Sequence, residues 1–462
     1  MIHPDKAAFA RATLPNGITV LAAISGGADS VSLLFFLREL GYPVIAASFD
    51  HQLRGENGRA DVVFVRDLCS EHQIPFISGT ADVGAFAVEK KLSIEEAARE
   101  LRYRFLFEQA VRYGAKAVAT GHTADDQVET VLMHFLRGAG IAGIKGMPPK
   151  TFLNIYSTTI PLVRPLLSWE RTDTENYCRQ IGIIPRIDET NLDTRFTRNK
   201  LRGEIIPILK KAYPNLVSTI NRSAEVLEGE SRLLDRLTVK SIAITLQQKA
   251  DGYFLFDREK LENLEHPLFQ RVIRMAGFEL SPGLRDLDKD AMDRLDLHKA
   301  TDLGGGLATL VEGNDFFLYK KGSSLPTERY PQINKPIPVA EGVLPFDNNW
   351  ILEVTYLGFG GKREDLQQDQ WVLFLEPKSI KGTLYIRPVN PGDRIEPLGM
   401  PRQSAKLTDI FINHKIPRRY RPTYPILVDD EKVLWVPGQK RSDKTKITPS
   451  SDEVIVIKIR RP

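Results

Sequence analysis

The chain is poor in the features that define several protein classes. Its 462 residues include only two cysteines, Cys69 and Cys178, and no CxxC pair, which argues against a disulfide scaffold, a structural zinc site and an iron–sulfur cluster. The apolar runs are far shorter than the roughly 18–20 residues that span a bilayer, so no membrane partner is expected. The N-terminal residues lack the apolar core of a signal peptide, so we expect a cytoplasmic protein.

Charge is close to balanced but unevenly distributed. The net charge is only +4, yet residues 381–462 hold 17 Lys and Arg against 9 Asp and Glu, so the rest of the chain is slightly acidic. A basic block on a mildly acidic body is typical of a protein that binds a polyanion. A solubilising surface is the alternative interpretation.

The first 210 residues alternate between short apolar segments and helical patterns. We expect strands over residues 18–24, 43–49, 75–77 and 117–120, and helices over 29–40, 60–72 and 94–113. This order predicts an α/β fold with a doubly wound parallel sheet. Ligands of such sheets bind at the carboxyl ends of the strands.

The pattern changes near residue 211. Residues 218–250 form a long amphipathic pattern and 254–280 continue largely helical, a hairpin is expected around Gly313, and 322–342 is rich in proline. Short strands and turns follow. The expected organisation is an α/β domain over 1–210, a mainly helical domain over 211–330, a connecting segment over 331–380 and a small basic α+β domain over 381–462.

The hexapeptide Ser25–Ser30, hereafter the phosphate loop, lies between the first strand and the first helix. Its glycines allow a tight turn, and the N-terminus of the following helix favours phosphate. The side chain of Asp29 can hold Mg²⁺ or cap the helix. The loop lacks the GK[ST] ending of a Walker A motif, which excludes a GTPase or motor. A simple strand–helix turn is the alternative.

Two further groups of basic residues could contact a polyanion. His51 and Arg54 follow the second strand, where a nucleotide is expected. Arg99 and Arg102 are three residues apart on one helix face and could both meet a polyanion, although a solvated helix with Glu–Arg pairs would have the same spacing.

The segment after the fourth strand contains an imidazole and two carboxylates. His122, Asp126 and Glu129 are spaced i, i+4 and i+7, which places them on one side as the chain enters a helix capped by Thr123. Such a group could bind a metal or a cationic substrate, or transfer protons. Capping combined with surface charge is the alternative.

These motifs resemble those of a known family. The SGGxDS loop resembles the pyrophosphate-loop enzymes, which cleave ATP between the α- and β-phosphates. Together with the later motifs, it resembles the tRNA(Ile)-lysidine synthase family. The further matching segments are 136–140, 164–167, 188–193, 196–199, Arg202, 386–387, 392–394, 406–409 and 415–417.

The resemblance implies ATP-dependent ligation of L-lysine to C2 of the wobble cytidine of a CAU-anticodon isoleucine tRNA. The reaction would form an adenylated cytidine and release pyrophosphate and AMP, with ATP and Mg²⁺ as cofactors. A homodimer is expected. The catalytic residues would be Asp29, which would also hold Mg²⁺, together with His122, Asp126 and Glu129. Asp126 and Glu129 would bind lysine.

The resemblance also assigns binding residues. ATP would contact Ser25, Gly26, Gly27, Ala28, Asp29, Ser30, His51 and Arg54. The tRNA would contact Arg99, Arg102, Arg198, Arg202, Arg418, Arg419 and Arg421. The last three surround Tyr420, an arrangement suited to phosphate contacts and base stacking, although a solvated basic turn is the alternative.

Three rival functions remain open. A tRNA thiolase generally needs paired cysteines, whereas Cys69 and Cys178 lie in separate segments. A small-molecule amidotransferase or synthetase does not explain the basic C-terminal block. A non-catalytic tRNA- or nucleotide-binding protein would be expected to lack some of Asp29, His122, Asp126 and Glu129.

Overall fold

The computed structural model describes residues 3–186, 197–282, 284, 287, 289–358, 369–400, 403–447 and 453–461. The chain forms two compact units. Unit 1 contains residues 1–244 and 266–285, and unit 2 contains 245–265 and 286–462. No helix among the described residues is both long enough and apolar enough to cross a bilayer.

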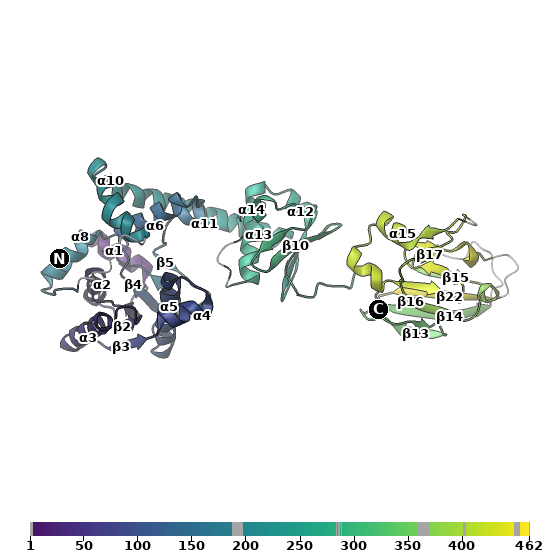
Figure 1. The fold of residues 1–462 in the computed structure, drawn as a ribbon, viewed down its shortest axis with the longest axis horizontal. Helices are drawn as coiled ribbons and strands as arrows, with labels where there is room; N and C mark the ends of the chain where they lie inside the picture. The colour runs from purple at the N-terminus through teal and green to yellow at the C-terminus, as the bar shows by residue number, and fades with distance from the viewer. Residues whose placement is uncertain are drawn as a thin grey trace. The chain divides into compact units, whose positions relative to one another are not determined.

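Unit 1 is built on a six-stranded sheet in the order β3-β2-β1-β4-β6-β5, in the purple-to-blue part of the ribbon in Figure 1. All of its neighbouring strands are parallel except β5 and β6. The strands are β1 (Val20–Ala23), β2 (Val44–Asp50), β3 (Phe76–Thr80), β4 (Ala117–Thr120), β5 (Lys150–Thr151) and β6 (Leu162–Val163). The predicted doubly wound parallel sheet is confirmed.

Helices connect and cover these strands. They are α1 (Pro4–Thr13), α2 (Ala28–Glu39), α3 (Glu56–Glu71), α4 (Val83–Lys90), α5 (Ile94–Arg112), α6 (Ala124–Leu136), α7 (Ile141–Ile144) and α8 (Arg171–Gln180). The later part contains α9 (Thr197–Lys200), a π-helical turn (Leu201–Ile205), α10 (Ile206–Ala212), α11 (Leu216–Thr245) and α13 (His266–Leu280).

The apolar residues of the central strands alternate between two cores. Val20 and Ala22 of β1 pack in one core with residues of α2, whereas Leu21 packs in the other with Val118 of β4 and Tyr103 of α5. Strand β1 lies between β2 and β4, so consecutive crossovers leave it in opposite directions. The switch point therefore lies at the carboxyl ends of β1 and β4, where such sheets bind ligands.

Unit 2 contains three sheets. The first has the order β7-β8-β11-β10-β9, with β7 (Leu246–Ala250), β8 (Tyr253–Asp257), β9 (Asp302–Gly304), β10 (Leu307–Glu312) and β11 (Asp315–Lys320), accompanied by α12 (Arg258–Glu262) and α14 (Lys289–Asp293). The predicted hairpin around Gly313 is confirmed by the antiparallel pairing of β10 with β11.

The other two sheets form the C-terminal part of unit 2. One has the order β12-β16-β19-β20-β17-β18, with β21 paired to β20, and the other has the order β13-β14-β22-β15. The strands are β12 (Ile337–Pro338), β13 (Gly342–Pro345), β14 (Ile351–Gly358), β15 (Val372–Leu375), β16 (Tyr385–Pro388), β17 (Arg394–Ile395), β18 (Ala405–Lys406), β19 (Pro425–Val428), β20 (Val433–Val436), β21 (Lys440–Arg441) and β22 (Glu453–Arg460). The described residues of this part also form α15 (Leu407–Asn413) and 3₁₀ turns at Pro377–Ser379, Arg418–Thr423 and Asp443–Thr445.

The structure has strands at residues 246–250 and 253–257, where the sequence predicted helix, and it has further strands in the segment 331–380. The amphipathic pattern of 218–250 leaves its helix after Thr245, and its last five residues form β7. Residues 253–257, at the start of the segment expected to be largely helical, form β8, because alternate aromatic side chains pack into the five-stranded sheet. The range 331–380 contributes strands to both C-terminal sheets, including β14 paired with β22.

Candidate active site

The phosphate loop joins β1 to α2 at the switch point. The Ser30 hydroxyl accepts hydrogen bonds from the backbone N–H groups of Ser25 and Gly26, both at 3.1 Å, and donates to the Gly27 carbonyl at 2.9 Å. Gly26 has a φ of +92°, which favours glycine. Helix α2 begins at the loop without a side-chain cap, so its first N–H groups point toward the ligand position.

The end of β4 packs directly against this loop. A Cβ atom added at Gly121 would lie 2.9 Å from the Asp29 carbonyl oxygen. Only glycine permits this approach, which brings the His122–Glu129 segment beside the phosphate loop. The two motifs therefore lie together at one edge of the sheet.

Asp29 is held by a residue that sequence reasoning missed. The Thr174 hydroxyl, on α8, donates to the Asp29 carboxylate at 2.6 Å. Burial raises the pKa of Asp29 above its ordinary value, the hydrogen bond from Thr174 lowers it in part, and the negative charge of Asp126 raises it further. Thr174 is 145 residues away in sequence, and no local pattern pointed to it.

The donor set around Asp29 is compatible with Mg²⁺ bound chiefly through a substrate. The described residues contain no group of three or more His, Cys, Asp and Glu side chains that could hold a metal alone. Mg²⁺ usually takes one or two carboxylates and completes its shell with phosphate oxygens and water. The partly buried Asp29, close enough to Asp126 for their charges to interact, fits that requirement.

His51 and Arg54 follow β2, as expected, but have different surroundings. Arg54 forms an ion pair with Asp61 at 3.0 Å, and Arg186 also pairs with Asp61. Burial, together with the positive charge of Arg102, lowers the pKa of His51 to about 4. The His51 ring is therefore neutral at pH 7, and its buried Nδ1 has no hydrogen-bond partner in the described part of the chain.

His122 lies just before α6, where positive charge surrounds it. Its Nδ1 is 2.8 Å from the Thr120 hydroxyl. Burial lowers the pKa of His122 well below its ordinary value, and nearby arginines, of which Arg164 has the largest effect, lower it further. The imidazole is thus neutral at pH 7 and can accept a hydrogen bond.

Asp126 and Glu129 lie together on α6 and bind two arginines. Glu129 is 1% exposed and accepts hydrogen bonds from the Nε of Arg198 at 2.8 Å and from the Nη2 of Arg202 at 2.9 Å. Asp126 accepts from the Nη2 atoms of Arg202 at 3.2 Å and Arg198 at 3.4 Å, while its other oxygen caps α6 by accepting from the Thr123 N–H. We call Asp126, Glu129, Arg198 and Arg202 the carboxylate cluster.

The remaining tRNA-binding candidates fall into two groups. Arg99 is exposed on α5, with its guanidinium carbon 5.0 Å from the centre of the Tyr103 ring, and Arg102 is half-buried against the same ring at 5.4 Å. The charges of both arginines lower the pKa of the buried His122 ring, which shows that both lie near it. Sequence reasoning did not single out Tyr103, although its position after Arg102 was a usable signal.

In unit 2, the arginines around Tyr420 have different roles in the structure. Arg419 pairs with the buried Glu312, Arg421 donates to the Ile416 carbonyl at 2.9 Å, and Arg418 is exposed. Tyr420 is 1% exposed and packs in the core, so it does not offer a stacking face for a base. The expectation of base stacking on Tyr420 is therefore wrong. The motif segment 188–193 and Phe196 lie outside the described residues.

Comparisons with known proteins agree with this geometry. Residues 7–209 match a PP-loop domain, and residues 384–458 match the TilS substrate C-terminal domain. A tRNA(Ile)-lysidine synthase of Dehalococcoides mccartyi is 32% identical over 462 residues, which cover 96% of each chain. One from Geobacter sulfurreducens is also 32% identical, and the match covers 96% of this chain and 93% of the relative.

Proposed function

The chain belongs to the family of tRNA(Ile)-lysidine synthases, and from this membership we infer that it is a ligase that uses ATP to join lysine to the wobble cytidine of an isoleucine tRNA. One observation carries the inference to this chain's own residues. The phosphate loop and a carboxylate pair that already binds cationic side chains lie next to each other at the switch point.

The phosphate loop serves the first half of the reaction. The cytidine O2 attacks the α-phosphorus of ATP, the bond to pyrophosphate breaks, and the O2 becomes part of a good leaving group. The N–H groups at the start of α2 stabilise the charge on the departing phosphates. Asp29 would hold Mg²⁺, which supplies further charge neutralisation when bound, and Thr174 keeps the Asp29 carboxylate in place.

The carboxylate cluster serves the second half. The lysine ε-amine attacks C2 of the cytidine, and AMP leaves with the electrons of the C2–O bond. The reference pKa of lysine, ~10.4, puts the neutral amine about 4.6 kcal/mol above the cation at pH 7. The site must therefore first bind the cation and then remove its proton.

We propose that Asp126 and Glu129 bind the lysine cation and that the neutral His122 orients the amine or relays its proton. Arg198 is the cation that lysine would displace, because it is more exposed than Arg202 and its contact with Asp126 is longer. The cluster thus stays neutralised without substrate and exchanges one cation for another when lysine binds.

The tRNA would be held by basic residues of both units. Exposed Arg99 and Arg418 are the best placed for phosphate contacts, and the CAU anticodon is the expected target. The tRNA affinity should fall steeply with salt, as expected for contacts with backbone phosphate.

The protein is expected to be a homodimer, which light scattering of the purified protein checks.

The function is tested by transfer of labelled lysine to RNA. Purified protein, ATP, Mg²⁺ and an unmodified CAU-anticodon isoleucine tRNA should give acid-precipitable, alkali-stable label. The label should vanish without ATP and with a changed wobble cytidine. Pyrophosphate release without lysine transfer would retain the adenylation step and overturn lysine as the nucleophile.

The lysine site is tested by Asp126→Asn. We expect the KM for lysine to rise by about tenfold or more with little change in ATP binding, because one of the two carboxylates that face the cation is lost. The matched control is Asp125→Asn on the same helix turn, whose carboxylate binds Lys210 and the Arg171 N–H instead. An unchanged lysine KM in folded Asp126→Asn protein would contradict the assignment.

A further inference from the structure

Three buried hydrogen-bond donors near His122 have no partner. The Nε atoms of Arg102 and Arg164 and the hydroxyl of Tyr103 are buried, and none makes a hydrogen bond within the described residues. Arg164 is 4% exposed and Tyr103 is 1% exposed. Among the described residues, the side chain of Arg164 has one hydrogen bond, from Nη1 to the Pro148 carbonyl at 2.6 Å. We call Arg102, Tyr103 and Arg164 the donor pocket.

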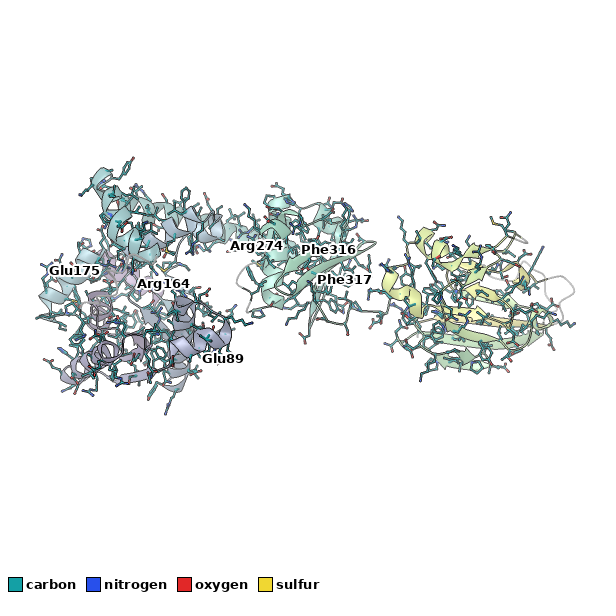
Figure 2. All side chains as sticks on the ribbon, in the orientation of Figure 1. Glu89, Arg164, Glu175, Arg274, Phe316 and Phe317 are labelled. Atoms are coloured by element: carbon teal, nitrogen blue, oxygen red, sulfur yellow. The ribbon has the colours of Figure 1, made fainter. Side chains whose placement is uncertain are left out.

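The fold brings these residues to the edge that carries the active site. Arg164 directly follows β6, which pairs in parallel with β4 through Ala119 and Val163. Thr120, the last residue of β4, and Arg164, the first residue after β6, therefore lie side by side, and His122 is two residues after Thr120. Figure 2 shows Arg164 within the N-terminal unit.

Tyr103 reaches the same edge from α5. It shares a core with Val118 of β4 and Leu162 of β6, and the guanidinium carbon of Arg102 is 5.4 Å from its ring centre. The charge of Arg164 acts on both Tyr103 and His122. The donor pocket therefore adjoins the phosphate loop on the side of β4 and β6.

This arrangement is unfavourable unless an anion completes it. A buried donor without a partner loses its hydration and gains no bond in return, and the cost is larger when the donor is charged. Burial lowers the pKa of Arg164 below its ordinary value, and burial and arginine charges lower the pKa of both His51 and His122. Burial is the largest cause of each shift, and arginine charges add to it: Arg99 acts on Arg164, Arg102 acts on His51, where Asp50 opposes it in part, and Arg164 acts on His122.

We propose that Arg102, Tyr103 and Arg164 form a subsite for a phosphoryl group beside the phosphate loop. A phosphoryl group carries several acceptor oxygens that guanidinium and phenol donors can satisfy together. The proposal rests on the proposed function, whose two large substrates, ATP and tRNA, both carry phosphate. Arg99 is exposed, its guanidinium carbon is 5.0 Å from the centre of the Tyr103 ring, and it would attract the ligand by its charge.

The test measures the binding of each source of phosphate separately. Arg164→Gln, Arg102→Gln and Tyr103→Phe are compared with wild type for a non-hydrolysable ATP analogue by calorimetry and for the tRNA by anisotropy at fixed salt. We expect the arginine variants to weaken one of these ligands by about 10- to 100-fold and Tyr103→Phe to weaken it several-fold. Weakening of the analogue assigns the subsite to the nucleotide, and weakening of tRNA alone assigns it to the RNA backbone.

The matched control is Arg104→Gln. Arg104 lies on the same helix but is exposed and paired with Glu100 at 2.7 Å, so both affinities should stay within about twofold of wild type. Ligand-free Arg102→Gln should be at least as stable to urea as wild type, because an unpaired charge has been removed. This second readout is independent of activity.

Normal binding of both ligands by folded Arg102→Gln and Tyr103→Phe would overturn the proposal, even if Arg164→Gln fails to fold. The proposed function fails separately, if the wild-type protein does not transfer lysine to the tRNA. The two failures are therefore distinguishable.

Discussion

Two groups of arginines lie at one edge of the same sheet, and their surroundings are opposite. In the carboxylate cluster, Arg198 and Arg202 share Asp126 and Glu129. In the donor pocket, Arg102 and Arg164 have buried donor atoms without a partner in the described residues. The first group is neutralised by the protein, and the second is completed by a ligand.

The comparison shows that positive charge alone does not identify a nucleic-acid contact. Arg198 and Arg202 were predicted to bind tRNA together with Arg99 and Arg102. That assignment stays a prediction, but the structure gives the first pair a second role as counter-ions of the lysine-binding candidates. The same contrast recurs in unit 2 between the paired Arg419 and the exposed Arg418.

The largest effect is expected from breaking the carboxylate cluster. Glu129→Gln removes the carboxylate that both arginines share, and should lower the free energy of unfolding by about 2–4 kcal/mol, because two partly buried cations lose a counter-ion. Urea unfolding measures this loss. The double variant Glu129→Gln/Arg202→Gln should lose less than the sum of the two single changes. Additive losses would show that the pair is not coupled.

A smaller effect is expected from the unit 2 pair. Arg419→Gln leaves the buried Glu312 without its partner and should lower the free energy of unfolding by about 2 kcal/mol. The exposed neighbour provides the control, since Arg418→Gln should leave stability within about 0.5 kcal/mol and reduce the salt slope of tRNA binding by about 0.9. Equal stability of the two variants would contradict the distinction between paired and free arginines.

A further effect concerns pH and sharpens the account of the donor pocket. The pKa of His51 is about 4 in the folded protein and ~6.5 in the unfolded chain, so the unfolded chain binds more protons between these values. Stability should therefore fall as pH drops from 6.5 toward 4, and His51→Gln should make this fall shallower. An unchanged slope in that variant would contradict burial of the neutral ring.

A second pH titration, that of the His122 ring, reports on the ligand of the donor pocket. A phosphoryl group bound beside His122 would oppose the arginine charges and raise the pKa of that imidazole. Titration of its ring signals by NMR, with and without the ATP analogue, measures the shift. If the pKa of His122 does not change on saturation with either phosphate ligand, the bound phosphoryl group does not lie beside His122.

The sequence determined the local features of this protein. Glycines between an apolar strand and a helix dictate the phosphate loop, and the alternation of strands with helices dictates a parallel sheet whose carboxyl edge binds ligands. The His122–Glu129 spacing likewise placed the two carboxylates on one helix. These are short-range properties, set by backbone sterics and periodicity within a few residues.

Only the tertiary structure decided which charges have partners. Thr174 meets Asp29 across 145 residues, Arg202 meets Glu129 across 73, and Arg419 meets Glu312 across 107. The burial of Tyr420 and the missing partners of Arg102 and Arg164 depend on the same long-range packing. An ion pair or an orphaned donor is defined by what lies across the fold, and the spacing of residues along the chain does not contain that information.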